Sequence, residues 1–362
     1  MLVGIEMVAP AEVGGRVHGG RAFLGLWAMR HSGIAAPSIE LLGLGDDVLV
    51  LLAQLSTSAA ALLAQCCTEL HTLLKGELHD LLRLQEVPSN VIKGLPGRYW
   101  IRQPLLGAGG LVHIVGHSAR ECVVLEGVAH QKQRDASDAC VWKRLVTDPM
   151  LIMPTAAALH GHWTLIADRA THLVHVLHDG CSLYTLEADA MRNPCGVATD
   201  GTRAIVCADG WVHVFDLNTR QCTVTWPAAV AVGGARLECE HGVAIHGNEV
   251  FIVDQRGSRV HVFSFEGGHL HSFGGKGTDP GRFRQPWGIA SCGPHVLVSE
   301  CGGRRVQAFT ADGRAVGHVA LEGCGTLSGL CAGTSKDGLC ALVADWDQCC
   351  VRELRLLPWY PA

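Results

Sequence analysis

The chain repeats a pattern of three short apolar runs at a nearly constant spacing. In the clearest copy the runs are residues 287–290, 296–299 and 305–309, and Gly-containing turns separate them. Runs this short between turns of that kind favour strands over helices. An acidic residue closes the middle run of each copy, at Asp168, Asp209, Asp254, Glu300 and Asp345, at intervals of 41, 45, 46 and 45 residues. A fixed period of this length built from strands predicts sheets arranged around an axis.

The clearest copy of the repeat contains a distinctive series of short sequence motifs. Residues 273–309 contain Phe-Gly, Gly-Arg-Phe, Pro-Trp-Gly-Ile-Ala and Arg-Val-Gln-Ala-Phe in that order. This pattern resembles the NHL repeat, whose family builds a β-propeller, usually of six blades. The strongest copies span about residues 192–325, and weaker copies extend the pattern to 98–357. We therefore expect a mainly β chain with an NHL-type β-propeller of six blades, some of them degenerate, over residues 98–357.

A propeller must join its first blade to its last, because an open array of blades leaves two unpaired sheet edges. The repeat pattern stops soon after Leu357, before an outer strand for the last blade. We expect residues from Tyr99 to Arg102 to supply that strand.

The residues before the repeats have a different pattern. Residues 1–37 are rich in Gly and Ala and are expected to form a mobile leader, and 87–97, with two Pro and two Gly, to form a linker. Between them, residues 38–86 carry Leu-rich stripes at helical spacing, the last at Leu78, Leu81 and Leu82. Residues 48–68 lack charge over a membrane-spanning length, but a polar Ser-Thr-Ser centre favours two amphipathic helices and no membrane insertion.

This helical segment also resembles a known module. Its Leu-Gly-Asp-Asp-Val-Leu start, its Ser-Thr-Ser break and its Cys-Cys-Thr-Glu-Leu run are similar to the F-box, the helical motif that docks on the Skp-type adaptor of cullin ubiquitin ligases. Gly45 stands where the family usually has Pro, and no Leu-Trp pair closes the motif. The resemblance implies that the adaptor contacts Val48, Leu52, Leu55, Leu62, Leu63, Cys66 and Leu70.

The net charge and the cysteine content of the chain limit the classes of function that it can have. The net charge is −5, with 29 basic and 34 acidic side chains, so the chain lacks the global basic excess of nucleic-acid-binding proteins. Its 16 cysteines include no Cys-x-x-Cys pair and indicate free thiols in a reducing, cytoplasmic or nuclear compartment. We expect neither a signal peptide nor an oligomer beyond the ligase complex.

No catalytic residue, metal site or cofactor is expected. A catalytic side chain would occur once, whereas the strand-end acids recur in each copy, as residues that hold turns do. Five histidines between 160 and 178 invite a metal site, but strand alternation sends neighbours to opposite faces. The sequence also lacks a nucleophile elbow and a phosphate-binding Gly-Lys-Ser/Thr loop.

One charged stretch is a candidate surface. Residues 254–314 hold 8 basic and 5 acidic side chains, and the residues expected to bind a partner or RNA are Arg256, Arg282, Arg284, Arg304 and Arg305. The leading hypothesis is a non-catalytic substrate receptor of a ubiquitin ligase, with the F-box on the adaptor and the propeller on a target protein. The alternatives are an RNA-binding NHL propeller and a plain propeller scaffold with a helical cap.

Overall fold

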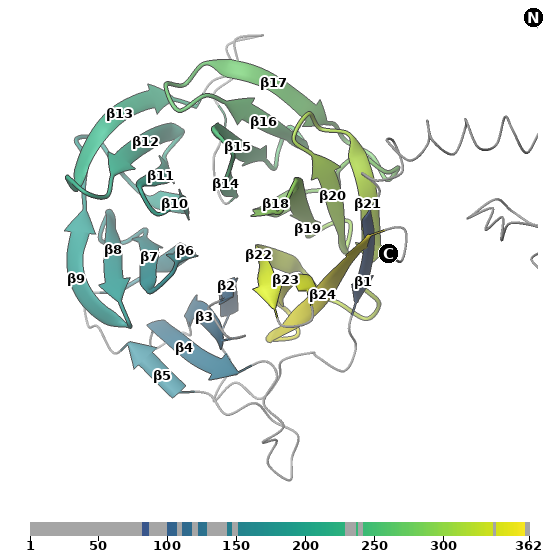
Figure 1. Ribbon diagram of the computed structural model, residues 1–362, viewed down its shortest axis with the longest axis horizontal. Coiled ribbons are helices and arrows are strands. Elements are labelled where there is room, and N and C mark those ends of the chain that lie inside the picture. The colour runs from purple at the N-terminus through teal and green to yellow at the C-terminus, as the bar shows by residue number, and fades with distance from the viewer. Residues whose placement is uncertain are drawn as a thin grey trace, which may run out of the picture. The chain divides into compact units, whose positions relative to one another are not determined.

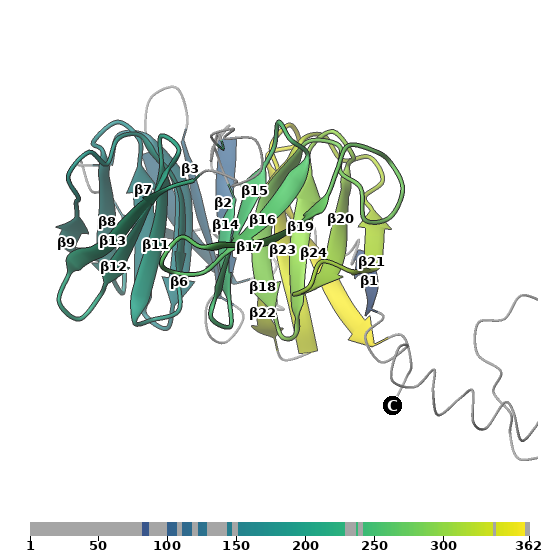
Figure 2. The same ribbon diagram turned by 90° about the horizontal axis from the view of Figure 1, so that it is seen from above.

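The computed structural model describes residues 82–86, 100–106, 111–117, 122–128, 143–146, 151–228, 237, 242–335 and 338–358. Within these residues 24 strands form six four-stranded antiparallel sheets, here called blades 1 to 6. The sheets stand around a central axis with their first strands innermost, as Figure 1 shows, and Figure 2 shows the same ring edge-on. The expected mainly β propeller is confirmed.

Blades 1 to 3 follow the chain from the inner to the outer strand. Blade 1 consists of β2 (Trp100–Leu106), β3 (Leu111–His117), β4 (Cys122–Val128) and β5 (Lys143–Val146). Blade 2 consists of β6 (Pro154–His160), β7 (Trp163–Asp168), β8 (Leu173–His178) and β9 (Cys181–Leu186). Blade 3 consists of β10 (Pro194–Thr199), β11 (Arg203–Ala208), β12 (Trp211–Asp216) and β13 (Gln221–Pro227).

Blades 4 and 5 repeat this order, and blade 6 borrows one strand. Blade 4 consists of β14 (Val243–His246), β15 (Glu249–Asp254), β16 (Arg259–Phe263) and β17 (His269–Gly274). Blade 5 consists of β18 (Pro286–Cys292), β19 (His295–Glu300), β20 (Arg305–Thr310) and β21 (Ala315–Ala320). Blade 6 consists of β22 (Leu327–Ser335), β23 (Gly338–Asp345), β24 (Cys350–Pro358) and β1 (Leu82–Glu86).

The apolar core is divided among the interfaces between blades. The second strands are rich in Val, Ile, Leu and Phe, and both faces of these strands are buried. The described core falls into six clusters, each shared by two neighbouring blades. One of these clusters joins Ile101 and Ile114 of blade 1 to Leu342 and Val351 of blade 6. No blade therefore buries its faces without a neighbour on each side.

The ring is closed by a strand that the sequence pattern misassigned. β1 pairs antiparallel with β24, and Leu84 lies opposite Leu356. The expectation that Tyr99–Arg102 supplies the outer strand is wrong, because Trp100–Leu106 is the inner strand of blade 1. The expected helix is likewise wrong over Leu82–Glu86. Leu82 and Leu84 fit a strand alternation as well as a helical stripe, and pairing with the exposed edge of β24 decides between them.

Residues 1–81 and 87–99 lie outside the described residues, and with them the expected leader, the rest of the expected helical module and the whole expected linker. No helix in the described part of the chain is long and apolar enough to cross a membrane.

Glycines allow the inner strands to approach one another at the axis. A Cβ at Gly329 of β22 would collide with the backbone carbonyl oxygen of Arg102 in β2. Hydrogen bonds cross the same seam, from Gln103 Nε2 to the Leu330 carbonyl at 2.7 Å and from Ser328 Oγ to the Ile101 carbonyl at 3.1 Å. The first and last blades are therefore joined at the axis as well as at the rim.

Closure by β1 predicts a large effect from one side chain. Leu84 is 6% exposed and packs in the cluster between blades 5 and 6, so Leu84→Ala should lower the free energy of unfolding by about 2–4 kcal/mol. The control is Leu183→Ala, in another outer strand but 55% exposed, which should change it by less than about 0.5 kcal/mol. Urea unfolding measures both variants, and equal effects would contradict the closure by β1.

Candidate interaction face

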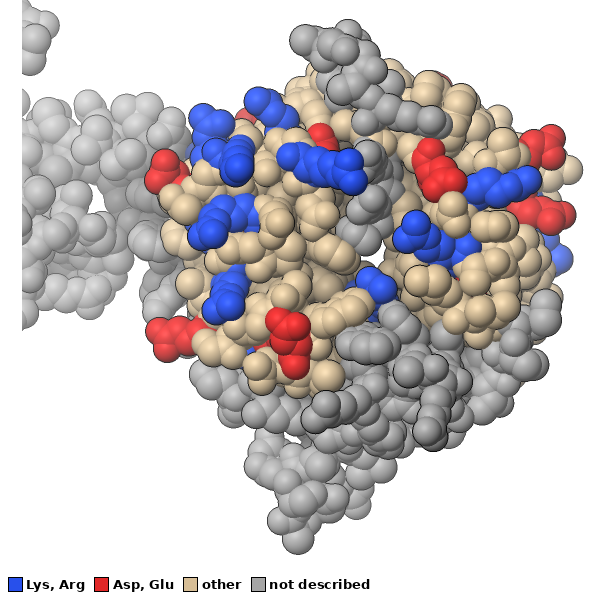
Figure 3. Space-filling model, turned by 180° about the vertical axis from the view of Figure 1, so that it is seen from behind, with Lys and Arg blue, Asp and Glu red and all other residues tan. Residues whose placement is uncertain are grey.

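One end of the propeller gathers most of the described cationic side chains. At this end, here called the basic face, each second strand ends, each third strand begins and the chain passes from blade to blade. Figure 3 views this end and shows Lys and Arg spread around the ring and at the rim of the central opening. The opposite end carries Arg203 at the start of β11, and Arg220 and Arg314 in its turns.

The strand-end acids of the basic face hold its turns together. Asp168 is fully buried, and its carboxylate accepts the backbone N–H groups of Ile152 at 2.6 Å, Met153 at 3.1 Å and Ala170 at 2.9 Å. Asp345 is also fully buried and pairs with Arg352 Nε at 3.0 Å. These carboxylates are saturated by the protein and point away from solvent.

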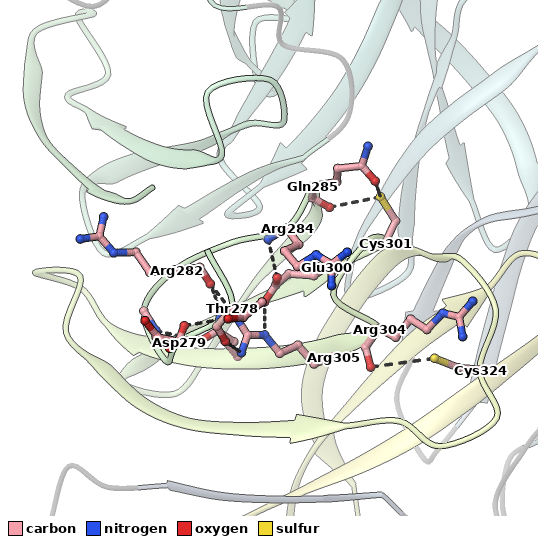
Figure 4. A network of polar contacts seen from close by, with 12 residues as sticks. Thr278, Asp279, Arg282, Arg284, Gln285, Glu300, Cys301, Arg304, Arg305 and Cys324 are labelled. Atoms are coloured by element: carbon pink, nitrogen blue, oxygen red, sulfur yellow. Dashed lines mark hydrogen bonds and ion pairs between the residues drawn. The ribbon is translucent and has the colours of Figure 1, made fainter. Parts of the chain in front are cut away.

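Glu300 is the centre of the largest of these networks, which Figure 4 shows. Its carboxylate accepts Arg305 Nε at 2.6 Å, the Arg284 backbone N–H at 2.7 Å and Gln307 Nε2 at 2.7 Å. Arg305 also donates to backbone carbonyls of the loop before β18, including that of Arg282 at 2.7 Å. The network ties the loop to β19 and β20.

The third strands contribute polar partners that we did not predict from the sequence. The third residue of this strand is His175, His213, His261, Gln307 or Arg352 in blades 2 to 6, and all five are buried. His261 Nε2 lies 3.5 Å from Asp254 Oδ2. Burial would raise the pKa of Asp254, but the imidazole of His261 and the backbone N–H of Gly257 outweigh burial and lower it. The signal was present in the sequence as Val-His-Val at equal repeat positions.

The structure separates the five candidate arginines into two groups. Arg305 is 9% exposed and bonded to Glu300, so little of its side chain is available to a partner or RNA. Arg256, Arg282, Arg284 and Arg304 are exposed. In Figure 4 the guanidinium groups of Arg282 and Arg304 extend away from the network around Glu300.

The exposed arginines and one lysine share the loops of two neighbouring blades. This set of side chains, here called the basic arc, comprises Arg256, Lys276, Arg282, Arg284 and Arg304. They lie on three loops of blades 4 and 5, namely 255–258, 275–285 and 301–304. Asp279 is the acidic residue within these three loops. Asp254 and Glu300 are the strand residues just before two of the loops, and their carboxylates accept backbone N–H groups.

The central opening at the basic face ends in a small cavity. Residues from the first half of all six inner strands or the turns before them line it, among them Arg102, Thr155, Trp287 and Gly329. The cavity holds about 30 Å³ of solvent space. This is room for roughly two water molecules, far less than a substrate of drug size requires.

The clustered histidines do not converge. His162 and His178 lie at the end opposite the basic face, near Asp179, whereas His175 is buried inside blade 2. In the part of the chain that the structure describes, no group of three or more His, Cys, Asp or Glu side chains is placed to hold a metal ion.

The network around Glu300 predicts opposite outcomes for two neighbouring arginines. Arg305→Ala should lower the free energy of unfolding by about 3 kcal/mol, because it leaves the Glu300 carboxylate buried without its cation. Arg304→Ala removes an exposed side chain of the basic arc and should change it by less than about 0.5 kcal/mol. Urea unfolding of the two variants checks this, and a mild effect of Arg305→Ala would refute the structural role.

Comparisons with known proteins agree with the fold. No protein-family model matches the chain, and no curated protein matches it. Among solved structures, a catalytically inactive variant of virginiamycin B lyase from Staphylococcus aureus with quinupristin is similar at a TM-score of 0.51 and 12% identity, over 76% of this chain and 100% of that one. A streptogramin B lyase is similar at 0.51 and 13%, over 77% and 99%.

A third similar structure is a protein of unknown function from Bacteroides thetaiotaomicron, with a TM-score of 0.54 and 12% identity, over 76% of each chain. At such identities the likeness concerns the fold and carries no activity with it. The comparisons and the sheet topology together show that this chain is a β-propeller.

Proposed function

We propose that this chain is a protein-interaction module whose propeller binds an acidic segment of a partner protein on the basic face. The observation that carries the proposal is the basic arc, in which two neighbouring blades expose five cationic side chains and one acidic side chain on their loops. The neighbouring carboxylates of Asp254 and Glu300 accept backbone N–H groups inside the turns. Such a surface speeds association and selects partners by charge.

RNA is the alternative ligand for a basic surface. Proteins that hold single-stranded RNA combine cations with exposed aromatic rings on which bases stack. Among the described residues, the exposed large apolar side chains at the basic face are Ile152 and Met153, which are not aromatic. The exposed Trp163 lies at the opposite end. This distribution favours a protein segment over RNA.

The proposed module would serve as the target-binding part of a ubiquitin ligase receptor. This step is supported by sequence alone, through the F-box resemblance of residues 38–86 and the NHL-like motifs of the repeats. The residues expected to contact the adaptor lie outside the described part of the chain. Such a receptor breaks no bonds. By tethering the target, it raises the effective concentration of a target lysine near the ubiquitin-loaded carrier enzyme to the order of mM.

The basic arc predicts a charge-dependent affinity. Replacing Arg282, Arg284 and Arg304 together by Glu should weaken binding to an acidic protein segment by about 100-fold at low salt, because attraction becomes repulsion. Arg220→Glu with Arg314→Glu, in turns at the opposite end, should change it by less than about threefold. Fluorescence anisotropy with an oligoglutamate peptide and with an RNA hairpin checks both. Selective loss of RNA binding in the arc variant would refute the protein-segment proposal.

The ligase role predicts a separate defect. Leu52→Asp with Leu63→Asp should abolish co-purification with a Skp-type adaptor and a cullin, because both substitutions place charge on the apolar stripes of the F-box-like segment. The basic-arc variant should retain that association while losing the target. An adaptor association that is unchanged by the Asp pair would contradict the F-box assignment.

A further inference from the structure

The inner strands bulge where they line the mouth of the central opening. In five of the six blades the register between the first and second strands shifts within the first residues of the inner strand. In blade 1 the shift falls between Ile101 and Gln103, so Arg102 is the residue without a partner in the ladder. A bulge re-aims a side chain, and here it turns Arg102 to the wall of the cavity.

Arg102 is a half-buried cation without a described counter-ion. Its guanidinium stacks on the ring of Trp346, with 4.2 Å between its central carbon and the ring centroid. Its Nε is buried and has no hydrogen-bond partner. Burial, and then the nearby charge of Arg169, lower the pKa of Arg102 to about 10, so the side chain stays charged at neutral pH.

Other arginines of the propeller show what is missing around Arg102. Arg305 and Arg352 are buried beside Glu300 and Asp345, and Arg203, which stacks on Phe265, pairs with Asp200 at 2.8 Å. Among the described residues no carboxylate pairs with Arg102, and the charge that affects its pKa is that of a second cation, Arg169. Stacking on an aromatic ring offsets part of the cost of removing a guanidinium from water, and an anion would offset the rest.

The surroundings of the mouth limit what that anion can be. With about 30 Å³ of solvent space, the cavity suits a group as small as a carboxylate better than a nucleobase or a sugar ring. Just before β6, whose Thr155 lines the cavity, Ile152 is 61% exposed and Met153 is 37% exposed, and the Arg169 backbone N–H donates to the Met153 carbonyl at 2.9 Å. A cation in a narrow opening beside two exposed apolar side chains fits an acidic residue that has an apolar neighbour.

We propose that the mouth of the central opening binds one Glu or Asp side chain of the partner segment, with Arg102 donating to its carboxylate and Ile152 and Met153 contacting an adjacent apolar residue. This proposal deepens the proposed function and rests on it. The basic arc then attracts the segment, and Arg102 fixes which residue enters the opening. Specificity for a carboxylate over an amide follows, because an amide would leave the charge of Arg102 uncompensated.

The experiment compares two blocked, fluorescein-labelled peptides, Gly-Gly-Glu-Leu-Gly-Gly and the same peptide with Gln in place of Glu. The intact chain should bind the Glu peptide about 10- to 100-fold more tightly. Arg102→Gln should reduce this ratio to about one. The matched control Arg220→Gln removes another arginine that stacks on a ring, with 4.3 Å to Tyr184, from the opposite end and should leave the ratio unchanged.

A second readout separates binding from structural damage. Arg102→Gln should raise the melting temperature of the unliganded chain, because it removes an uncompensated half-buried charge, whereas loss of a structural arginine lowers it. Arg102→Lys keeps the positive charge but lacks the planar guanidinium group. The ratio of its affinities for the Glu and Gln peptides should therefore lie between those of the intact chain and Arg102→Gln.

The outcomes also separate this inference from the proposed function. If the intact chain binds the Glu peptide and the ratio survives Arg102→Gln, the Arg102 assignment is wrong and the basic-arc proposal stands. If neither peptide binds and oligoglutamate also fails, both proposals fall. A lower melting temperature for Arg102→Gln together with an unchanged ratio would assign Arg102 a purely structural role.

Discussion

The packing of each blade against its two neighbours is the interaction on which the rest of this structure depends. Every described apolar cluster is shared between two sheets, so an isolated sheet would expose both of its faces. The ring must therefore be complete, and the pairing of β1 with β24 and the hydrogen bonds between β2 and β22 complete it. Loop residues such as Phe283 and Leu321 also pack in these clusters, whereas the exposed side chains of the loops are available for other contacts.

Crowding at the axis has a second effect. The six inner strands approach so closely that residues such as Gly329 must lack a side chain. Bulges interrupt the strand pairing at the basic-face end of these strands, as in β22. At these bulges side chains depart from the regular alternation between the two faces of the sheet, as Arg102 does. The geometry that closes the ring thus also produces its most unusual charge, a guanidinium held against Trp346 without a described carboxylate.

Much of the fold follows from the sequence, because the repeat has one strand pattern and one strand-end acid per copy. Asp168 and Glu300 occupy turns, as a recurring residue should. The pattern failed where a local signal is ambiguous. Leu82–Glu86 alternates like a strand within a helical stripe, and only the unpaired edge of β24 selects the strand. Arg304 and Arg305 are adjacent in sequence, yet Arg304 lies in the turn and is exposed, whereas Arg305 begins β20 and is buried against Glu300.

The site was harder to anticipate than the fold. Arg102 lies in a degenerate blade, and neither its stacking on Trp346, 244 positions later, nor its place in a bulge has a signature in the sequence. The pairing of β1 with β24 also sets an order of events during synthesis. β1 leaves the ribosome long before its partner exists, so blade 6 stays incomplete until translation has passed residue 358, and folding of the ring ends only after that point.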